Sequence, residues 1–351
     1  MKRYLFFGGK GGVGKTTAAS ATALFLLKKL KRTSATKLKP SPGTVSPGTA
    51  DVSPAPSILL FSTDPAHSLS DSLGVKIGNR LVLVAGEGET PAVPGQMVQV
   101  AEHKGAKLIA YEMDAALALE RFRAAHGKVL AEIAERGTLL DDEDINELLN
   151  LSLPGLDEVM SLFELSELDR DGKYAHIVVD TAPSGHTSRL LRLPEVFARM
   201  VNALDRMGEK HRYMVAHFAR RKAVADEIDL FLRDLIARIE SVRHLLYDAQ
   251  QTSFTLVTIP EAMSVRETQR YLELLREQQV PVTDLIVNRV EQEHAGCVYC
   301  AARVAMQRPW LKEIEKSFSN LKIHHVPLFA QEVRGLGPLE KIGTQIWTRK
   351  N

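Results

Sequence analysis

The sequence predicts an α/β fold with a doubly wound, mainly parallel sheet, and three observations support this prediction. Short apolar runs suited to buried strands alternate with longer segments of helical periodicity. Several of these apolar runs are followed by polar loops, an arrangement typical of parallel strands that end at a binding site. The 351 residues, 44% hydrophobic and 25% charged, have the composition of a globular protein with a large core.

The first strand is expected at 4–7, followed by a glycine-rich loop and a helix over 18–30. Residues 9–16 fit the pattern G-x-x-x-x-G-K-[ST], in which backbone N–H groups approach phosphates. In that pattern Lys15 meets the β and γ phosphate oxygens and Thr16 coordinates Mg²⁺. The segment therefore predicts a P-loop NTPase.

A dinucleotide-binding fingerprint is the competing interpretation, because Gly9, Gly11 and Gly14 also satisfy G-x-G-x-x-G. That fingerprint requires an acidic residue about 20 positions further on, in a second strand. Here that region is rich in proline, serine and lysine, so the P-loop interpretation is favoured. We expect a disordered surface insertion at 31–57, because such a composition buries too little apolar area to order the chain. A tether for a partner is the alternative for this segment.

Two further strands, at 58–61 and 175–179, end at polar loops that begin near Asp64 and at Asp180. Between the strands, two stretches have helical periodicity, and we expect them to form a helical subdomain inserted into a single P-loop domain over 1–351. The remaining strands are expected at 254–257, 285–287 and 323–326, the remaining helices at 265–278 and 307–317, and the helical stretches at 115–168 and 195–248.

Charge and hydropathy narrow the function classes. The 45 basic residues nearly balance the 43 acidic ones, and a net charge of +2 argues against a surface that follows nucleic-acid phosphates. No stretch approaches the roughly 20 apolar residues of a membrane span, and the first ten residues do not have the form of a signal peptide. A cytosolic location is expected, with peripheral association to a membrane partner.

Residues 9–17, Gly-Lys-Gly-Gly-Val-Gly-Lys-Thr-Thr, resemble the deviant Walker A class of ATPases through the additional Lys10. This resemblance implies a homodimer in which Lys10 crosses to the phosphates of the partner subunit, a task that suits a mobile point charge. The ATP-binding residues expected in this loop are Gly9, Lys10, Gly11, Gly12, Val13, Gly14, Lys15, Thr16 and Thr17.

Further segments resemble the ArsA/GET family, which comprises arsenite-pump ATPases and ATPases that target tail-anchored proteins. They are 62–71, 180–187, 259–261, 288–289 and 326–335, and the resemblance covers nearly the whole chain except 31–57. It implies a Mg²⁺-dependent ATPase in which ATP closes the dimer and hydrolysis reopens it. It also implies that Asn288 reads the adenine edge, with Pro327 and Phe329 as an apolar wall.

Phosphoryl transfer needs one carboxylate to orient the attacking water and another to hold the metal. Asp64 is the candidate for the water and Asp180 the candidate for Mg²⁺, so Asp64, Lys10 and Lys15 form the expected catalytic set. Either aspartate is also suited to an N-cap. His67 and His186 are equally suited to buried hydrogen bonding.

Cys297 and Cys300 are the only cysteines, and their C-x-x-C spacing also resembles the family's C-terminal pair. Two thiolates do not complete a tetrahedral site, but a twofold axis supplies four, which makes an intersubunit Zn²⁺ site geometrically natural. As(III) and redox chemistry are the other possibilities. His294 is a possible accessory ligand.

Two cargoes are compatible with this family. One is arsenite, expelled through a membrane pump; the other is a hydrophobic membrane anchor, carried to a membrane receptor. A client groove favours Met-rich helix faces. Met200, Met207 and Met214 are interleaved with basic residues, so an ordinary amphipathic helix explains them equally well. The sequence weakly favours the arsenite-pump subunit, and an iron–sulfur scaffold ATPase ranks third.

Overall fold

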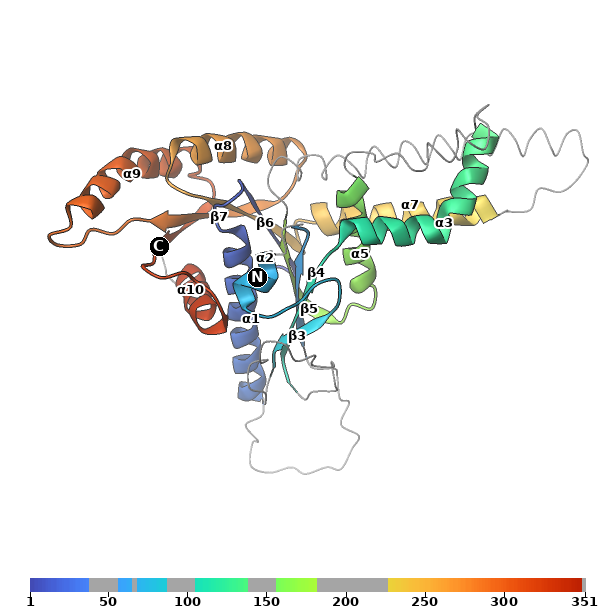
Figure 1. The fold of residues 1–351 in the computed structure, drawn as a ribbon, viewed down its shortest axis with the longest axis horizontal. Coiled ribbons are helices and arrows are strands. Elements are labelled where there is room, and N and C mark those ends of the chain that lie inside the picture. Colours follow the sequence, from blue (N-terminus) through green and yellow to red (C-terminus); the bar gives the residue numbers. More distant parts are fainter. Residues whose placement is uncertain (38–55, 65–67, 87–104, 138–155, 182–226, 349–351) are drawn as a thin grey trace, which may run out of the picture. The chain divides into compact units, whose positions relative to one another are not determined.

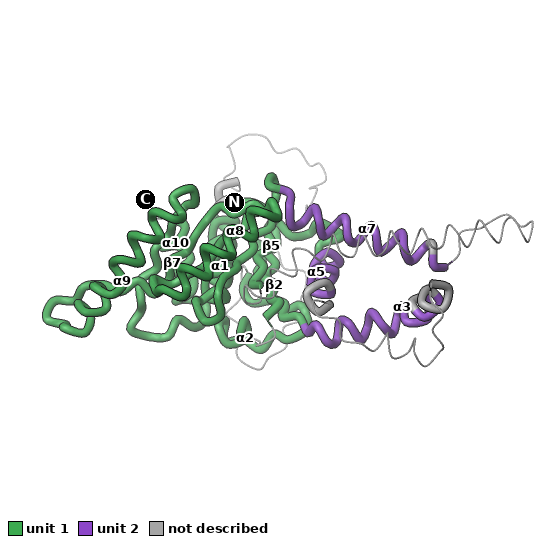
Figure 2. Tube along the Cα trace, turned by 90° about the horizontal axis from the view of Figure 1, so that it is seen from above, with its two compact units in different colours: residues 1–113, 169–187, 249–351 green, residues 114–168, 188–248 purple. Residues whose placement is uncertain are grey.

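The chain forms two compact units (Figure 2). The computed structural model describes residues 1–37, 56–64, 68–86, 105–137, 156–181 and 227–348. Unit 1 comprises residues 1–113, 169–187 and 249–351, and unit 2 comprises residues 114–168 and 188–248. The helical stretches expected at 115–168 and 195–248 fall within unit 2. Among the helices that are described, none has both the length and the apolar character needed to cross a bilayer.

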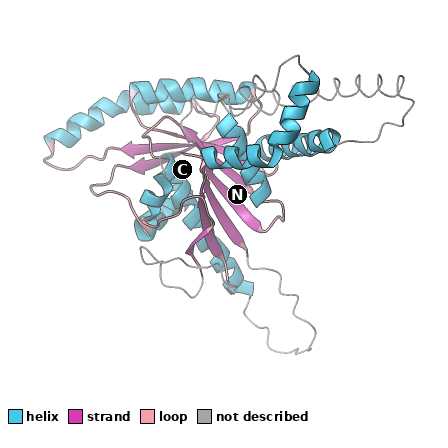
Figure 3. Ribbon diagram, turned by 45° about the vertical axis from the view of Figure 1, so that its right-hand side comes forward, coloured by secondary structure: helices cyan, strands magenta, loops and turns pink. Residues whose placement is uncertain are grey.

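Unit 1 is built on an eight-stranded sheet (Figures 1 and 3). Its strands are β1 (Tyr4–Gly9), β2 (Ser57–Ser62), β3 (Val82–Ala85), β4 (Lys107–Glu112), β5 (Tyr174–Asp180), β6 (Thr252–Thr258), β7 (Val282–Val290) and β8 (Lys322–Pro327). They are arranged in the order β3-β4-β2-β5-β1-β6-β7-β8. Each neighbouring pair is parallel except β3 and β4. The predicted α/β fold with a mainly parallel sheet is therefore confirmed.

Helices cover both faces of this sheet, which explains why its strands are continuous apolar runs. On one face, Leu5 and Phe7 of β1 belong to a core shared with α1 (Lys15–Lys37), α2 (Ser68–Leu73) and α10 (Leu336–Thr348). On the other face, Phe6 stacks on Phe254, and Tyr271 of α8 (Ala262–Glu277) packs edge-on against Phe254. The alternation within β1 thus places successive side chains in two different layers.

Helix α1, which carries the end of the phosphate loop, packs closely against α10. A Cβ at Gly343 of α10 would clash with the carbonyl oxygen of Ala21, so only glycine permits this approach. Trp347 Nε1 donates a hydrogen bond to Thr22 Oγ1 over 2.9 Å. Leu339 and Ile342 are buried in the same core. Helix α10 therefore fixes the helix that begins at Lys15.

The strands expected from the sequence are present, and each is longer than expected at one or both ends. Strands β3 and β4 were not expected, although the apolar residues between Lys107 and Glu112 are a signal for β4. Helix α1 extends to Lys37, so the boundary expected at residue 31 was wrong for its first seven residues. Residues 38–55 of the expected insertion lie outside the described residues. Helix α9 (Val298–Ser317) begins nine residues earlier than expected.

Three helices of unit 2 are described: α3 (Ala115–Gly137), α5 (Leu156–Leu168) and α7 (Glu227–Tyr247). Phe231 of α7 contacts both Phe122 and His126 of α3, with ring centroids 6.4 and 5.0 Å apart. Arg238 lies 3.5 Å from Glu167 of α5. These contacts make the described part of unit 2 a helical layer with its own apolar interior.

Candidate functional site

The phosphate loop runs from the end of β1 to the start of α1, as the sequence predicts. Two of its glycines are required by close neighbours. A Cβ at Gly9, where φ is +153°, would clash with the carbonyl oxygen of Val257. A Cβ at Gly14, where φ is +95°, would clash with Asn288 Nδ2. Gly11 and Gly12 are exposed, and a Cβ at either of them would enter open space.

Lys15 is the first residue of α1, and its side chain is nearly buried in the loop. Its Nζ donates a hydrogen bond to the carbonyl oxygen of Lys10 over 3.2 Å. Burial lowers the pKa of Lys15, while the carboxylates of Asp180 and Asp64 act in the opposite direction. The ammonium group is therefore held at the helix N-terminus with two carboxylates in its surroundings.

A chain of oxygen atoms connects the two aspartates expected at the site. Thr16 Oγ1 donates to Asp180 Oδ2 over 2.6 Å and lies 3.0 Å from Ser68 Oγ. Ser68 Oγ in turn donates to Asp64 Oδ2 over 3.3 Å. Residues from α1, β5, α2 and the loop after β2 thus meet at the carboxyl ends of neighbouring strands.

Asp180 is fully buried at the end of β5. Burial raises its pKa to about 7, although the hydrogen bond from Thr16 and the charge of Lys15 act against the rise. Its Oδ1 has no hydrogen-bond partner among the described residues. A buried carboxylate oxygen without a partner, beside a hydroxyl group, is an oxygen donor set that suits Mg²⁺. The residues at this position therefore fit the metal.

Lys10 lies on the other side of the loop and faces α8 of its own chain. Its Nζ is 3.9 Å from Glu267 Oε2, and both side chains are about one-third exposed, at 32% each. An exposed ion pair of this length contributes little to stability. The contact that the resemblance implies, from Lys10 to a partner subunit, stays a prediction.

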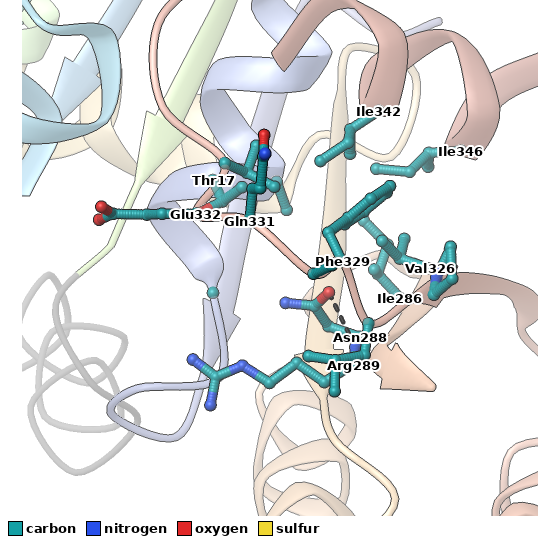
Figure 4. Close-up of a pocket in the computed structure, with 16 residues that line it drawn as sticks. Thr17, Ile286, Asn288, Arg289, Val326, Phe329, Gln331, Glu332, Ile342 and Ile346 are labelled. Carbon is teal, nitrogen blue, oxygen red and sulfur yellow. Dashed lines mark hydrogen bonds between the residues drawn. The ribbon is translucent and has the colours of Figure 1, made fainter. Parts of the chain in front are cut away.

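A pocket of about 440 Å³ lies beside the phosphate loop (Figure 4). All three residues expected to bind adenine, Asn288, Pro327 and Phe329, line it. The other lining residues include Gly14, Thr17, Ile286, Val326, Ile342 and Ile346. Apolar side chains and polar ones such as Asn288 and Thr17 both line this pocket, and a concave site with a few convergent polar groups is the usual form of a small-ligand site.

The amide of Asn288 connects this pocket to the phosphate loop. Its Nδ2 donates to the carbonyl oxygen of Val13 over 2.9 Å, and its Oδ1 accepts the backbone N–H of Arg289. Arg289 has φ of +57°, an uncommon conformation outside glycine. The side chain of Asn288 is therefore fixed in direction before any nucleotide is bound.

The cysteine pair lies at the start of α9 and forms a disulfide, Cys297–Cys300. Cys297 is the N-cap residue, and its sulfur accepts the backbone N–H of Cys300. The two sulfur atoms are thus bonded to each other in this structure, and the Zn²⁺ or As(III) site stays a prediction. His294 is exposed. Within the described ranges, no group of three or more His, Cys, Asp or Glu side chains is arranged to hold a metal.

Several residues of the site were not assigned a role from the sequence. Ser68 bridges Thr16 and Asp64, and Glu267 pairs with Lys10. Serine and glutamate are common on solvent-exposed helices, so residue type alone gave no signal, and only the fold brings them to the loop. His67, His186 and the methionines at 200, 207 and 214 lie outside the described residues.

The sequence is similar to characterised families over almost its whole length. The model of the anion-transporting ATPase family, ArsA ATPase, matches residues 2–42 and 44–348. A protein named ATPase GET3 from Phaeosphaeria nodorum is 29% identical, over 97% of this chain and 93% of its own. Another ATPase GET3, from Ajellomyces dermatitidis, is 30% identical over 98% and 90%. ATPase ASNA1 homolog 2 from Paramecium tetraurelia is 28% identical over 97% and 91%.

Proposed function

This chain belongs to the anion-transporting ATPase family, and on that premise we propose that it is a Mg²⁺-dependent ATPase that works as a homodimer. The observation that carries the proposal is the meeting of Thr16, Ser68, Asp64 and Asp180 beside the buried ammonium group of Lys15. Such an arrangement places a metal ligand, a water-orienting carboxylate and a phosphate-binding cation within one loop cluster.

Each residue has a distinct role in this proposal. Backbone N–H groups of residues 9–14 bind the phosphates, and Lys15 neutralises charge on the β and γ oxygens. Thr16 and Asp180 hold the metal, which neutralises charge on the transferred phosphoryl group when it is bound. Asp64 orients the attacking water, and Ser68 fixes the direction of its carboxylate. This division of work is the one that phosphoryl transfer requires, because its barrier is lowered mainly by positioning and electrostatics.

The nucleotide base occupies the pocket beside the loop in this proposal. Phe329, which is 39% exposed, and the side chains of Ile286 and Ile342 offer the apolar surface for the ring. Asn288 has one more amide hydrogen and a further acceptor lone pair than its two intramolecular bonds use. Those remaining sites suit the paired donor and acceptor of an adenine edge.

Dimer formation follows from the resemblance of the loop to the deviant Walker A class. ATP would close two copies face to face, and Lys10 would leave Glu267 to reach the partner's phosphates. Breaking the Lys10–Glu267 ion pair should cost little free energy, because the pair is long and partly exposed. Hydrolysis would then reopen the dimer.

For the cargo, we favour the targeting of hydrophobic membrane anchors over arsenite export. The relatives that cover the chain carry the names GET3 and ASNA1, and they match it across more than 90% of this chain's length. An arsenite role would need Cys297 and Cys300, the chain's only two cysteines, as reduced thiolates, so the disulfide that joins them in this structure would have to open. In this role the protein would act in the cytosol and deliver its client to a membrane receptor.

Two measurements test the proposal. Steady-state hydrolysis of Mg·ATP should be lost in Lys15→Ala, whose melting temperature should stay close to that of the wild type. In parallel, the purified protein should capture a synthetic peptide with a C-terminal hydrophobic anchor, and arsenite should leave its ATPase rate unchanged. Stimulation by arsenite that disappears in Cys297→Ser/Cys300→Ser, without peptide capture, would instead establish the export role.

A further inference from the structure

Glu112 is a buried carboxylate that the proposed hydrolysis steps do not use. It ends β4, and its side chain is 1% exposed. Its Oε1 accepts the backbone N–H of Ser70 over 2.7 Å, and its Oε2 accepts the hydroxyl of the same serine over 2.6 Å. The backbone N–H of Gly78 also approaches Oε2, at 3.3 Å. Glu112 therefore accepts hydrogen bonds from both the backbone and the side chain of Ser70 in α2. One of its oxygens also accepts a hydrogen bond from Gly78, in the turn after this helix.

Burying a carboxylate is unfavourable unless several donors compensate for the lost water, and an apolar side chain usually stabilises a core more. Here the compensating donors are the groups of Ser70 and Gly78 that bond to Glu112, and each such hydrogen bond requires a particular direction. Ser70 Oγ donates to Glu112 and also accepts the N–H of Ile77, so helix α2, the turn after it and β4 are joined through one hydroxyl group. This network fixes where α2 lies along the end of β4.

The position of α2 matters because one of its ends contacts the residues of the proposed site and the other contacts a residue close to the base pocket. At its first residue, Ser68 Oγ contacts Thr16 Oγ1 and Asp64 Oδ2. Near its end, the carbonyl oxygen of Ser72 accepts the N–H of Gly335, which follows the segment that lines the base pocket. A shift of α2 along β4 would therefore move the hydroxyl group of Ser68. That hydroxyl group contacts both Thr16, the proposed metal ligand, and Asp64, the proposed water-orienting residue.

We propose that Glu112 is a positioning residue for ATP hydrolysis: by holding Ser70, it sets the place of Ser68, and through Ser68 it aligns Thr16 and Asp64. This inference rests on the proposed ATPase function. Its hydrogen bonds to Ser70 and Gly78 connect Glu112 to α2 and to the turn after it, and we infer that it acts on the site through α2. The effect belongs mainly in kcat, because misplacement of groups that are aligned for the transition state slows the chemical step more than it weakens binding.

The charge and shape of the side chain are both needed. In Glu112→Gln the amide oxygen can still accept the N–H of Ser70 and the NH₂ group can donate to Ser70 Oγ, but that NH₂ group then faces the N–H of Gly78, and bonds to a charged carboxylate become weaker neutral ones. The variant keeps the volume of the core, so its main effect is on the register of α2. Ser70→Ala removes the hydroxyl bond from the other partner.

The experiment is a double-mutant cycle on Mg·ATP hydrolysis by the full chain, with Glu112→Gln, Ser70→Ala and the double variant. Each single change should lower kcat about tenfold and change KM less than threefold, since small misplacements of reacting groups are enough for such losses. The double variant should be no slower than the slower single one, because both changes break the same link. Amide exchange in residues 68–78 should be faster in all three.

Ser72→Ala is the matched control on the same helix. The hydroxyl of Ser72 is buried and has no hydrogen-bond partner among the described residues, so its removal should leave kcat unchanged. Ser70→Thr, which keeps the hydroxyl, should restore most of the rate lost in Ser70→Ala. If Glu112→Gln folds poorly, the two Ser70 variants still decide the question.

Three results would overturn the inference. An active wild type with unchanged kcat in Glu112→Gln and Ser70→Ala would show that α2 needs no such anchor. Additive losses in the double variant would show that the two residues act separately. A folded wild type that hydrolyses no ATP would reject the proposed function, and the inference with it.

Discussion

Thr16 Oγ1 lies 2.6 Å from Asp180 Oδ2, although 164 positions separate the two residues. The first follows the loop after β1 and the second ends β5, and these two strands are hydrogen-bonded neighbours in the sheet, with Phe7 opposite Asp180. A parallel sheet brings the carboxyl ends of its strands to one edge, so the pair is a direct product of the topology. The fold alone therefore brings together the two side chains that we propose as metal ligands.

Asp180→Asn should lower Mg²⁺-dependent turnover about 100-fold or more, because an amide is a much poorer metal ligand than a carboxylate. The nucleotide-free variant should melt at the same temperature as the wild type or higher at pH 8. Folding raises the pKa of this carboxyl to about 7, so the wild type loses stability as pH rises from about 4 to that value. Asp71→Asn, on an exposed side chain, is the control and should change neither quantity.

Lys10→Ala should lower kcat at least tenfold and prevent the dimer that a non-hydrolysable ATP analogue induces, as judged by light scattering. Its melting temperature should hardly change, because the pair with Glu267 is long and partly exposed. Glu267→Gln removes the same pair but keeps the lysine, so it should remain active and dimerise. Equal losses in both variants would assign Lys10 to its own chain.

Asn288→Ala should weaken ATP binding about tenfold and reduce the preference for ATP over GTP. The change removes the hydrogen bond to Val13 together with the polar edge offered to adenine, and each such bond contributes about 1 kcal/mol. Titration calorimetry on the nucleotide-free protein measures both affinities. Gln331→Ala, at an exposed residue of the same pocket, should change them less than twofold. An unaltered ATP-to-GTP ratio in Asn288→Ala would contradict its role in base recognition.

Gly9→Ala should lower the free energy of unfolding by about 2 kcal/mol or more, because its Cβ meets a backbone carbonyl and its φ disfavours other residues. Gly11→Ala is the matched comparison in the same loop. Its Cβ enters open space, so its stability should stay within about 0.5 kcal/mol of the wild type. Denaturant titration without nucleotide measures both, and equal stabilities would refute the steric argument.

The Asp284–His324 contact predicts a pH dependence of stability away from the site. Burial opposes ionisation of Asp284, but hydrogen bonds from His324 and Thr283 outweigh it and lower its pKa. A lowered carboxyl pKa stabilises the fold above the unfolded value, about 3.9, and this stability is lost as pH falls through the folded value. The difference in melting temperature between wild type and Asp284→Asn should therefore be largest near neutral pH and shrink below about pH 4. The exposed Asp171→Asn should show no such trend.

The central strands and the phosphate loop could be predicted from the sequence. A buried parallel strand has to be an apolar run, and glycine is needed where two backbone segments approach each other closely. The sequence also placed Asp64 and Asp180 at strand ends. It was not sufficient for Glu112, Ser68 or Glu267, whose partners lie far away in the chain. The antiparallel β3, only four residues long, has too little pattern to be recognised.

The cysteine pair shows a different limit of prediction from sequence. A C-x-x-C spacing is compatible with metal, metalloid and disulfide chemistry, and its resemblance to the family's C-terminal pair favours the first two. In the structure Cys297 caps α9, and the helical turn that follows brings the second sulfur to the first as a disulfide, while the metal and metalloid sites stay predictions. Spacing fixes which residues are able to meet, but the oxidation state depends on conditions that spacing does not encode.

The close packing of α1 against α10 has a consequence for the order of events during synthesis. The ribosome makes the helix that begins with Lys15 and Thr16 early, yet its neighbours Gly343 and Trp347 are made more than 300 positions later. A nascent chain that lacks those residues therefore leaves one side of that helix without the apolar surface of α10.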